Sequence, residues 1–265
     1  MWDFEHAPLN EALAKRYIVD RMTPSECAAR LADGRADIGL IPIASLATTP
    51  GLRILPGCTI ASKGKVRSLI LVHRARVSPS KLRSVAADAA SRTTLVYARM
   101  MFHKWGNAEV PFLPMVADLD AMLEQADAAI LIGDPALLAL EERNNQFERT
   151  GEELVYVDLA EEWRRLTGLA FVSAVWGIAC SSALDQSIAE DFMRSRDHGL
   201  ANIDALVAEW SQRFPIPEQT IRTYLTTNIH YVLDEECVEG MRGFFHMAAE
   251  LGILPKYELV MAKSQ

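Results

Sequence analysis

Two apolar stretches decide the fold: VRSLILVH at residues 66–73 and FVSAVWGIA at residues 171–179. Short runs of apolar and β-branched residues are typical of buried strands. Segments that alternate between strand and helix patterns precede the first stretch, and more of them lie between the two. We therefore expect the first stretch to carry the chain out of one lobe and the second to carry it back.

The predicted fold is α/β and two-lobed, with the plan of a type II periplasmic binding protein. This plan has a ligand cleft between the lobes, and here a helical C-terminal tail is added. Residues 1–75 and 175–265 are expected to form lobe one, and residues 76–174 to form lobe two. The alternation of strands with helices predicts parallel strand pairing. One continuous doubly wound sheet is the alternative that spacing alone leaves open.

Capping patterns predict where several helices begin. Residues 23–26 (TPSE) are typical of a capping box with proline at the first helical position. Asp158 is expected to begin a second helix, and Asp134 to cap a third whose first residue is Pro135. Three further helical segments are predicted at residues 182–214, 217–229 and 234–251, with a break in the first near Gly199.

Composition and charge limit the function classes. A net charge of −8 argues against general binding of nucleic acid or of anionic membranes, but it allows a small anion in a pocket with its own local field. The N-terminal MWDFEH lacks the apolar core of a signal peptide, and the four cysteines form no CxxC pair. We expect a cytoplasmic protein with reduced cysteines, whose oligomeric state the sequence does not specify.

The common cofactor and metal motifs are absent from the sequence. It contains no GxGxxG, GxSxG, HExxH or Walker A motif, and no cysteine and histidine with zinc-ligand spacing. Dinucleotide-binding, serine-hydrolase, zinc-protease and NTPase functions therefore have no motif support in this sequence.

Two loop-to-helix junctions carry candidate binding residues. Ser91, Arg92 and Thr93 open a predicted helix after a strand, where free N–H groups and the helix dipole favour a carboxylate. Arg92 can add a charge-assisted hydrogen bond. Gly133 and Asp134 end another strand, where backbone can approach a ligand. The structural alternatives are a plain N-cap beside a surface arginine, and a capping aspartate.

Several segments, in order along nearly the whole chain, match the pattern of one enzyme family. They are ADIGLIPI at 36–43, IAS at 60–62 with VRS at 66–68, Asp88 with SRT at 91–93, LIGDPAL at 131–137, DL at 158–159 with EW at 162–163, TGLAFV at 167–172 with VW at 175–176, and the tail from 231 to 252. On these segments the chain resembles the chorismate dehydratases of the futalosine route to menaquinone, the MqnA family.

The resemblance implies a binding-protein fold without cofactor or metal, and the conversion of chorismate to 3-[(1-carboxyvinyl)oxy]benzoate. Loss of the C3 hydrogen and the 4-hydroxyl makes the ring aromatic, so the enzyme mainly holds a dianion and excludes water. One substrate carboxylate lies near the C3 hydrogen and can itself act as the base. We expect this substrate to be bound by Ser91, Arg92, Thr93, Gly133 and Asp134.

Ser68 is the candidate catalytic residue. It follows a basic run, Lys63, Lys65 and Arg67, and opens a strand predicted to cross between the lobes, which places it at the floor of the cleft. Its expected role is to donate a hydrogen bond that orients the substrate carboxylate toward the C3 hydrogen. The alternatives are a serine bonded to neighbouring backbone and, for the basic run, a solvated turn.

The N-terminal segment departs from the family pattern. Members begin with a strand and an SYLN motif whose asparagine lines the cleft, whereas this chain begins with MWDF about where that motif should have ended. Asn10 lies too far along, in a helix pattern, to replace this asparagine. We expect an in-frame extension of roughly ten to twenty residues, enough for one strand and a turn.

Two other functions stay open on the sequence. The sister enzymes that form 1,4-dihydroxy-6-naphthoate (MqnD) usually carry a glycine-rich segment where this chain has DAASRT at residues 88–93, which favours the dehydratase. A small-anion solute-binding protein is the alternative of another class, and it predicts a signal peptide or a lipid anchor.

Overall fold

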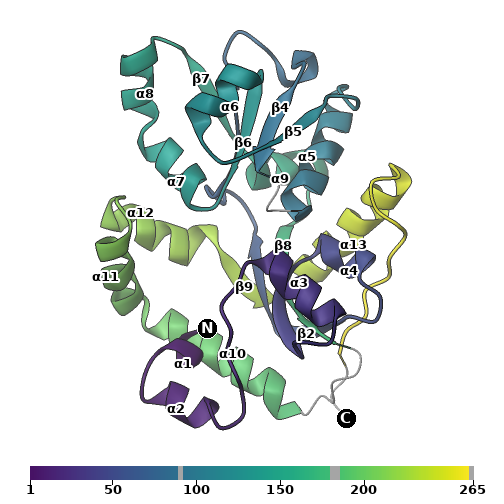
Figure 1. Ribbon diagram of the computed structural model, residues 1–265, viewed down its shortest axis with the longest axis vertical. Helices are drawn as coiled ribbons and strands as arrows, with labels where there is room; N and C mark the ends of the chain where they lie inside the picture. Colours follow the sequence, from purple (N-terminus) through teal and green to yellow (C-terminus); the bar gives the residue numbers. More distant parts are fainter. Residues whose placement is uncertain (89–91, 180–185, 263–265) are drawn as a thin grey trace.

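The computed structural model describes residues 1–88, 92–179 and 186–262, which form two lobes, each built on its own sheet (Figure 1). The lower lobe in Figure 1 holds four strands in the order β1 (Ile38–Pro42), β8 (Phe171–Ile178), β2 (Arg53–Ser62) and β9 (His230–Leu233). The upper lobe holds five in the order β5 (Phe112–Met115), β4 (Val85–Asp88), β6 (Ala128–Ile132), β3 (Leu69–Arg74) and β7 (Leu154–Asp158). The two-lobed α/β prediction is confirmed, and the single continuous sheet is excluded.

The prediction of parallel pairing is correct for one part of the upper sheet only. β4 pairs parallel with β5 and β6, as expected for strands joined by helices. β3 pairs antiparallel with β6 and β7, and β8 pairs antiparallel with β1 and β2. β3 and β8 are the strands that enter their sheets from the other lobe, so they run against the strands beside them.

Helices cover both sheets. In the lower lobe they are α1 (Trp2–Glu5), α2 (Leu9–Leu13), α3 (Pro24–Ala32), α4 (Ala44–Thr48), α10 (Gln186–Ala201), α11 (Ile203–Arg213), α12 (Glu218–Thr223) and α13 (Glu235–Glu250), with a π-helical turn at Tyr224–Asn228. In the upper lobe they are α5 (Arg92–Lys104), α6 (Leu119–Gln125), α7 (Asp134–Glu141), α8 (Arg143–Thr150) and α9 (Leu159–Thr167), with a 3-10 turn at Pro79–Lys81.

Two capping predictions are confirmed and one is wrong. Thr23 and Glu26 form the predicted capping box on α3, and Asp158 caps α9 through the amides of residues 160 and 161. Asp134 is instead the first helical residue of α7, and Gly133 is its N-cap with a φ of 69°. Glycine adopts this left-handed conformation without the steric penalty of a Cβ, so the chain turns at residue 133 rather than at the aspartate.

The helical break predicted near Gly199 falls at Asn202, between α10 and α11. The side-chain amide of Asn202 donates to the carbonyl of His198 at 2.8 Å. A side chain that bonds back to the preceding turn competes with the helical backbone, which explains why the helix ends there.

The N-terminal segment packs on α10, beside the lower sheet. Asp3 is 2% exposed, and its amide donates to Ser195 Oγ at 2.9 Å. Asp191 is 3% exposed and accepts hydrogen bonds from Arg16 at 2.5 Å and from Tyr17 at 2.8 Å. Buried carboxylates are stable only with such partners, so these bonds fix the N-terminal segment to the lower lobe.

A shared hydrophobic core connects the lobes on the α13 side. Tyr97 of α5 stacks on Phe171 of β8 with ring centroids 3.8 Å apart, and its ring centroid lies 4.5 Å from that of Phe244 in α13. The Tyr97 hydroxyl also donates to the carbonyl of Val172 at 3.3 Å and accepts from its amide at 3.1 Å. An upper-lobe helix is thereby anchored to the backbone of a lower-lobe strand.

The sheets suggest where the chain changes lobe. β3, which begins at Leu69, pairs within the upper sheet, and β8, which begins at Phe171, pairs within the lower sheet. The lobe boundaries predicted from sequence lie at residues 75 and 175. We propose instead that the chain changes lobe at residues 63–68 and again at residues 168–170.

Candidate functional site

Ser68 lies where the chain passes between the lobes, at the end of the connector formed by residues 63–68. It is 6% exposed and directly precedes β3. Its carbonyl oxygen accepts a hydrogen bond from the amide of Gly133 at 2.7 Å, one position beyond the β3–β6 pair Leu69 and Ile132. Two residues that the sequence analysis proposed separately, Ser68 and Gly133, are therefore adjacent.

The backbone is strained one residue before Ser68. Arg67 has a φ of 63°, the left-handed region, which is unfavourable by roughly 1–2 kcal/mol for a residue with a Cβ. The amides of Val66 and Arg67 donate to the Asp158 carboxylate at 3.0 and 2.7 Å. The Arg67 guanidinium pairs with Glu141 of α7 at 2.7 Å. These contacts hold the strained turn in place, and such strain is concentrated at functional sites.

Tyr224, which the sequence analysis missed, donates its hydroxyl proton to Ser68 Oγ at 3.1 Å. It begins the π-helical turn that follows α12, and turns of this kind are frequent at functional sites. Burial is the main cause that raises the pKa of Tyr224, and the negative charge of Asp134 makes a smaller contribution in the same direction. The phenol therefore stays protonated. A single tyrosine in a helical pattern gives no sequence signal of this role.

Asn228 ends the same π-helical turn and also contacts the connector. It is 7% exposed, and its Nδ2 donates to the carbonyl of Lys65 at 3.0 Å. Within the part of the chain that the structure describes, its buried Oδ1 accepts no hydrogen bond. A buried acceptor without a donor is unfavourable by about 1–3 kcal/mol, so a ligand that donates a hydrogen bond there would be stabilised.

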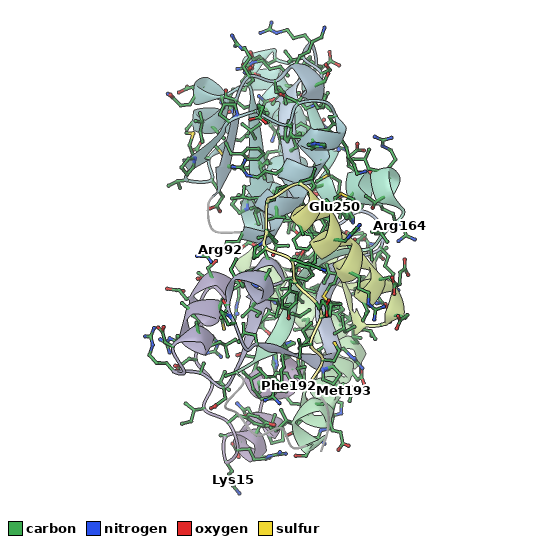
Figure 2. The ribbon with its side chains drawn as sticks, turned by 90° about the vertical axis from the view of Figure 1, so that its right-hand side faces the viewer. Lys15, Arg92, Arg164, Phe192, Met193 and Glu250 are labelled. Atoms are coloured by element: carbon green, nitrogen blue, oxygen red, sulfur yellow. The ribbon has the colours of Figure 1, made fainter. Side chains whose placement is uncertain are left out.

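The start of α5, the predicted carboxylate site, is only partly described. Ser91 lies outside the described residues. Arg92 is exposed, and Figure 2 shows it at the level where the lobes meet, on the opposite side of the view from Glu250. Thr93 is 1% exposed, and its hydroxyl oxygen accepts from the amide of Ala44, the first residue of α4, at 3.2 Å. Thr93 therefore connects the two lobes.

The basic residues before Ser68 do not form a free positive patch. Lys63 pairs with Asp234 at 2.6 Å and with Glu236 at 2.9 Å. Lys65 lies 3.7 Å from Glu161, and Arg67 pairs with Glu141 as described above. All three cations of the basic run lie within ion-pair distance of acidic side chains, and these pairs stabilise the connector.

Three potential metal ligands, His230, Asp234 and Cys237, lie with one ligand atom each within 4.8 Å of one another. Burial alone would raise the pKa of Asp234, but hydrogen bonds from Lys63, the Cys237 amide and His230 outweigh it and keep the pKa below its usual range. Burial raises the pKa of Cys237 to about 12, so its thiol is protonated. With the Lys63 ammonium at 2.6 Å from Asp234, the charge is already balanced, and the cluster fits an ion-pair network better than a metal site.

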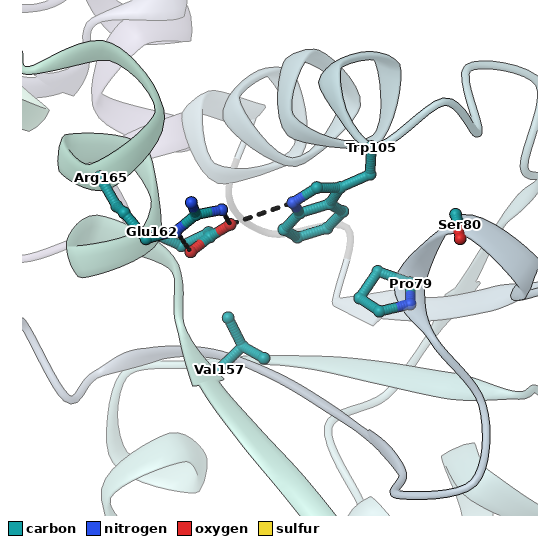
Figure 3. Close-up of a pocket in the computed structure, with 6 residues that line it drawn as sticks. All are labelled: Pro79, Ser80, Trp105, Val157, Glu162 and Arg165. Carbon is teal, nitrogen blue, oxygen red and sulfur yellow. Dashed lines mark hydrogen bonds and ion pairs between the residues drawn. The ribbon is translucent and has the colours of Figure 1, made fainter.

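A pocket of about 340 Å³ opens in the upper lobe (Figure 3). It is lined by Pro79, Ser80, Trp105, Val157, Glu162 and Arg165, none of which was a predicted site residue. Glu162 accepts from Trp105 Nε1 at 3.0 Å and from Arg165 at 2.6 and 2.7 Å. Because these polar groups satisfy one another, the pocket offers apolar surface and few groups that would fix a charged ligand.

Comparison with known families identifies the chain's relatives. A family model described as menaquinone biosynthesis matches residues 3–250, a range that includes strands of both sheets. The chain belongs to this menaquinone biosynthesis family. The connector, Ser68, Tyr224 and the start of α7 all lie within the matched range. The family to which the sequence resemblance pointed is therefore confirmed.

Solved structures of similar fold support the two-lobed architecture of this family member. Protein AF1704 from Archaeoglobus fulgidus has 14% identity and a TM-score of 0.65, covering 88% of this chain and 86% of that chain. The aliphatic sulphonate binding protein SsuA from Escherichia coli has 14% identity and a TM-score of 0.61, covering 97% and 88%. A Candida albicans protein with the generic periplasmic binding protein fold has 12% identity and a TM-score of 0.60, covering 97% and 89%. At these identities the likeness establishes the fold alone.

In residues 1–88, 92–179 and 186–262, no helix combines the length and apolar character needed to cross a bilayer.

Proposed function

We propose that this member of the menaquinone biosynthesis family is a chorismate dehydratase, a cytoplasmic lyase that forms 3-[(1-carboxyvinyl)oxy]benzoate. The observation that carries the proposal is the arrangement of Ser68, a buried hydroxyl between the lobes that accepts a hydrogen bond from Tyr224. A hydroxyl that accepts from one partner keeps its own proton to donate to another. In the proposed elimination, this proton is donated to the substrate carboxylate and orients it.

In this reaction the main task of the protein is to position the substrate, and no strong acid or base is required from it. A substrate carboxylate removes the C3 proton, and the electron pair of that C–H bond forms the new ring double bond. The bond from C4 to oxygen breaks, and the leaving hydroxyl takes up a proton and departs as water. In this proposal Ser68 donates to the carboxylate and orients it toward C3, as preorganised donors do in other enzymes.

We propose that the start of α5 holds a carboxylate of the dianion, through Ser91, Arg92 and Thr93, and that Gly133 and Asp134 contact the substrate from the start of α7. Lys63 and Arg67 are already ion-paired. Arg92 forms no ion pair within the described part of the chain, so its guanidinium is available to an incoming carboxylate. The dipole of the 13-residue helix α5 adds to the attraction at its N-terminal end.

Two alternatives remain. The fold is shared with SsuA, an aliphatic sulphonate binding protein, which favours a small-anion binding protein as the second candidate. The sister activity that forms 1,4-dihydroxy-6-naphthoate belongs to the same pathway, and the DAASRT segment at residues 88–93 argues against it because it lacks glycine.

The test is incubation of the purified protein with chorismate, followed by chromatography and mass spectrometry. We expect an aromatic product that is lighter than chorismate by one water, formed faster than the spontaneous rearrangement of chorismate. Binding of chorismate without turnover would favour the binding protein. Turnover of cyclic dehypoxanthinyl futalosine in place of chorismate would favour the sister enzyme.

A further inference from the structure

The π-helical turn at Tyr224–Asn228 and the connector at residues 63–68 contact each other at two points. Tyr224 donates to the side chain of Ser68, and Asn228 donates to the backbone carbonyl of Lys65. A π-helix closes i→i+5 hydrogen bonds, so its turns are wider than those of an α-helix and residues four apart stay on one face. The widened turn therefore presents Tyr224 and Asn228 side by side to the connector.

The Ser68–Tyr224 hydrogen bond has a defined direction. The Tyr224 proton is donated to Ser68 Oγ at 3.1 Å, and Ser68 Oγ has no other hydrogen-bond partner among the described side chains and backbone groups. A serine hydroxyl has one proton and two lone pairs. With one lone pair held by Tyr224, rotation about the Cβ–Oγ bond is restricted, and the proton points away from the phenol.

Tyr224 keeps the proton that it donates to Ser68. Burial is the main cause that raises the pKa of its phenol, so the phenolate is disfavoured. The backbone of Ser68 is held independently, because its carbonyl accepts from Gly133 and the preceding Arg67 amide is bound to Asp158. Tyr224 can therefore fix the orientation of the Ser68 hydroxyl proton about the Cβ–Oγ bond.

We infer that Tyr224 is a positioning residue that acts through Ser68, aiming the serine proton at the substrate carboxylate. The inference rests on the proposed dehydratase function. The sequence predicted a catalytic role only for Ser68, at the end of the connector. With Tyr224, the C-terminal helical region of the lower lobe also contributes to orienting the substrate.

The test is a double-mutant cycle between Tyr224→Phe and Ser68→Ala, with chorismate as substrate. Tyr224→Phe keeps the ring and its packing, and it should lower kcat roughly tenfold while KM changes less than about twofold, as for a lost orienting hydrogen bond. In the Ser68→Ala background the same substitution should change kcat little, because its target is gone. Tyr156→Phe is the matched control: among the described residues, the buried Tyr156 hydroxyl of β7 has no hydrogen-bond partner, so kcat should not change.

Different results would contradict the positioning role of Tyr224 and the proposed dehydratase function. Normal kcat in Tyr224→Phe, or effects of the two substitutions that multiply in the double variant, would overturn the positioning role while leaving the dehydratase intact. If the wild-type protein does not convert chorismate, the proposed function fails. Calorimetric titration with 3-[(1-carboxyvinyl)oxy]benzoate then decides: an equal loss of affinity in both single variants supports the coupling, and unchanged affinity in Tyr224→Phe overturns it.

Discussion

The hydroxyl oxygen of Thr93 in the upper lobe accepts a hydrogen bond from the amide of Ala44 in the lower lobe, at 3.2 Å. Thr93 is the second residue of α5, and Ala44 is the first of α4, so the bond joins two helix starts across the lobe junction. Thr93 was predicted as a substrate ligand. Its position adds a structural role, because the same oxygen accepts a hydrogen bond from the buried Ala44 amide.

Thr93→Val should reduce both stability and ligand affinity. Valine has a similar shape but leaves the Ala44 amide without an acceptor, which should lower the free energy of unfolding by about 1–3 kcal/mol. Loss of the hydroxyl should weaken binding of the benzoate product by about 1–2 kcal/mol if it also contacts a carboxylate. Urea unfolding and calorimetry measure the two effects. Thr93→Ser should preserve both, and a stability loss without any loss of affinity would make Thr93 purely structural.

Ser68→Ala should lower kcat on the order of 10²-fold and change KM by less, as for removal of one donor used in the transition state. Steady-state kinetics with chorismate give both constants. Ser211→Ala is the control, because this serine bonds back to the carbonyl of Val207 within α11, away from the connector. Near-normal kcat in Ser68→Ala would make Ser68 a structural residue, and Asp134 would then be the next candidate to test.

Asp158→Ala should affect the connector as well as α9. Its carboxylate caps the helix and also accepts from the amides of Val66 and Arg67, so its loss should lower the free energy of unfolding by about 2–4 kcal/mol. The strained turn before Ser68 should relax, and kcat should fall. Asp118→Ala, which removes a cap from α6 alone, should lower stability by about 0.5–2 kcal/mol and leave kcat unchanged. Equal effects of the two substitutions on kcat would disprove a role for Asp158 in the site.

Asp234→Asn should destabilise the protein at neutral pH and have a smaller effect in acid. The pKa of the folded-state carboxyl lies below the ordinary value of about 4, so folding favours the ionised form. This contribution is present above about pH 4 and is lost as the pH falls toward the folded-state pKa. Thermal unfolding of both proteins at pH 7 and at pH 3 provides the measurement. A Tm difference that does not shrink at pH 3 would contradict it, and Asp33→Asn, in an exposed pair with Arg35, should show little change at either pH.

The features predicted correctly from sequence are those with local causes. The capping box at Thr23 and the cap at Asp158 depend on residues three positions away, so a short stretch of sequence specifies them. The edge strands β5, β7 and β9 were missed because they are short and half-exposed, and their stability comes from pairing with distant strands.

In the candidate site, too, features with local causes were predicted and features that depend on distant residues were not. Ser68 and Gly133 were proposed from the ends of apolar runs, and their contact follows from the β3–β6 register. Tyr224 lies 156 residues from Ser68 in sequence, and only the packing of the C-terminal helices brings the two together. The left-handed backbone of Arg67 could not be predicted from sequence either, because an arginine gives no conformational signal comparable to that of glycine.

The anchoring of Tyr97 between Phe171, Phe244 and the backbone of Val172 constrains how a ligand can enter and leave. Separating the lobes on that side would expose several aromatic rings and break two buried hydrogen bonds, so we expect the aromatic stack to act as the hinge axis. Opening would then separate α7 from α12, where Leu137 and Ile221 share a buried cluster and Thr220 donates to Glu141 at 3.3 Å. Amide hydrogen exchange would show slow exchange around Tyr97 in both free and bound protein, and ligand-dependent exchange along α12.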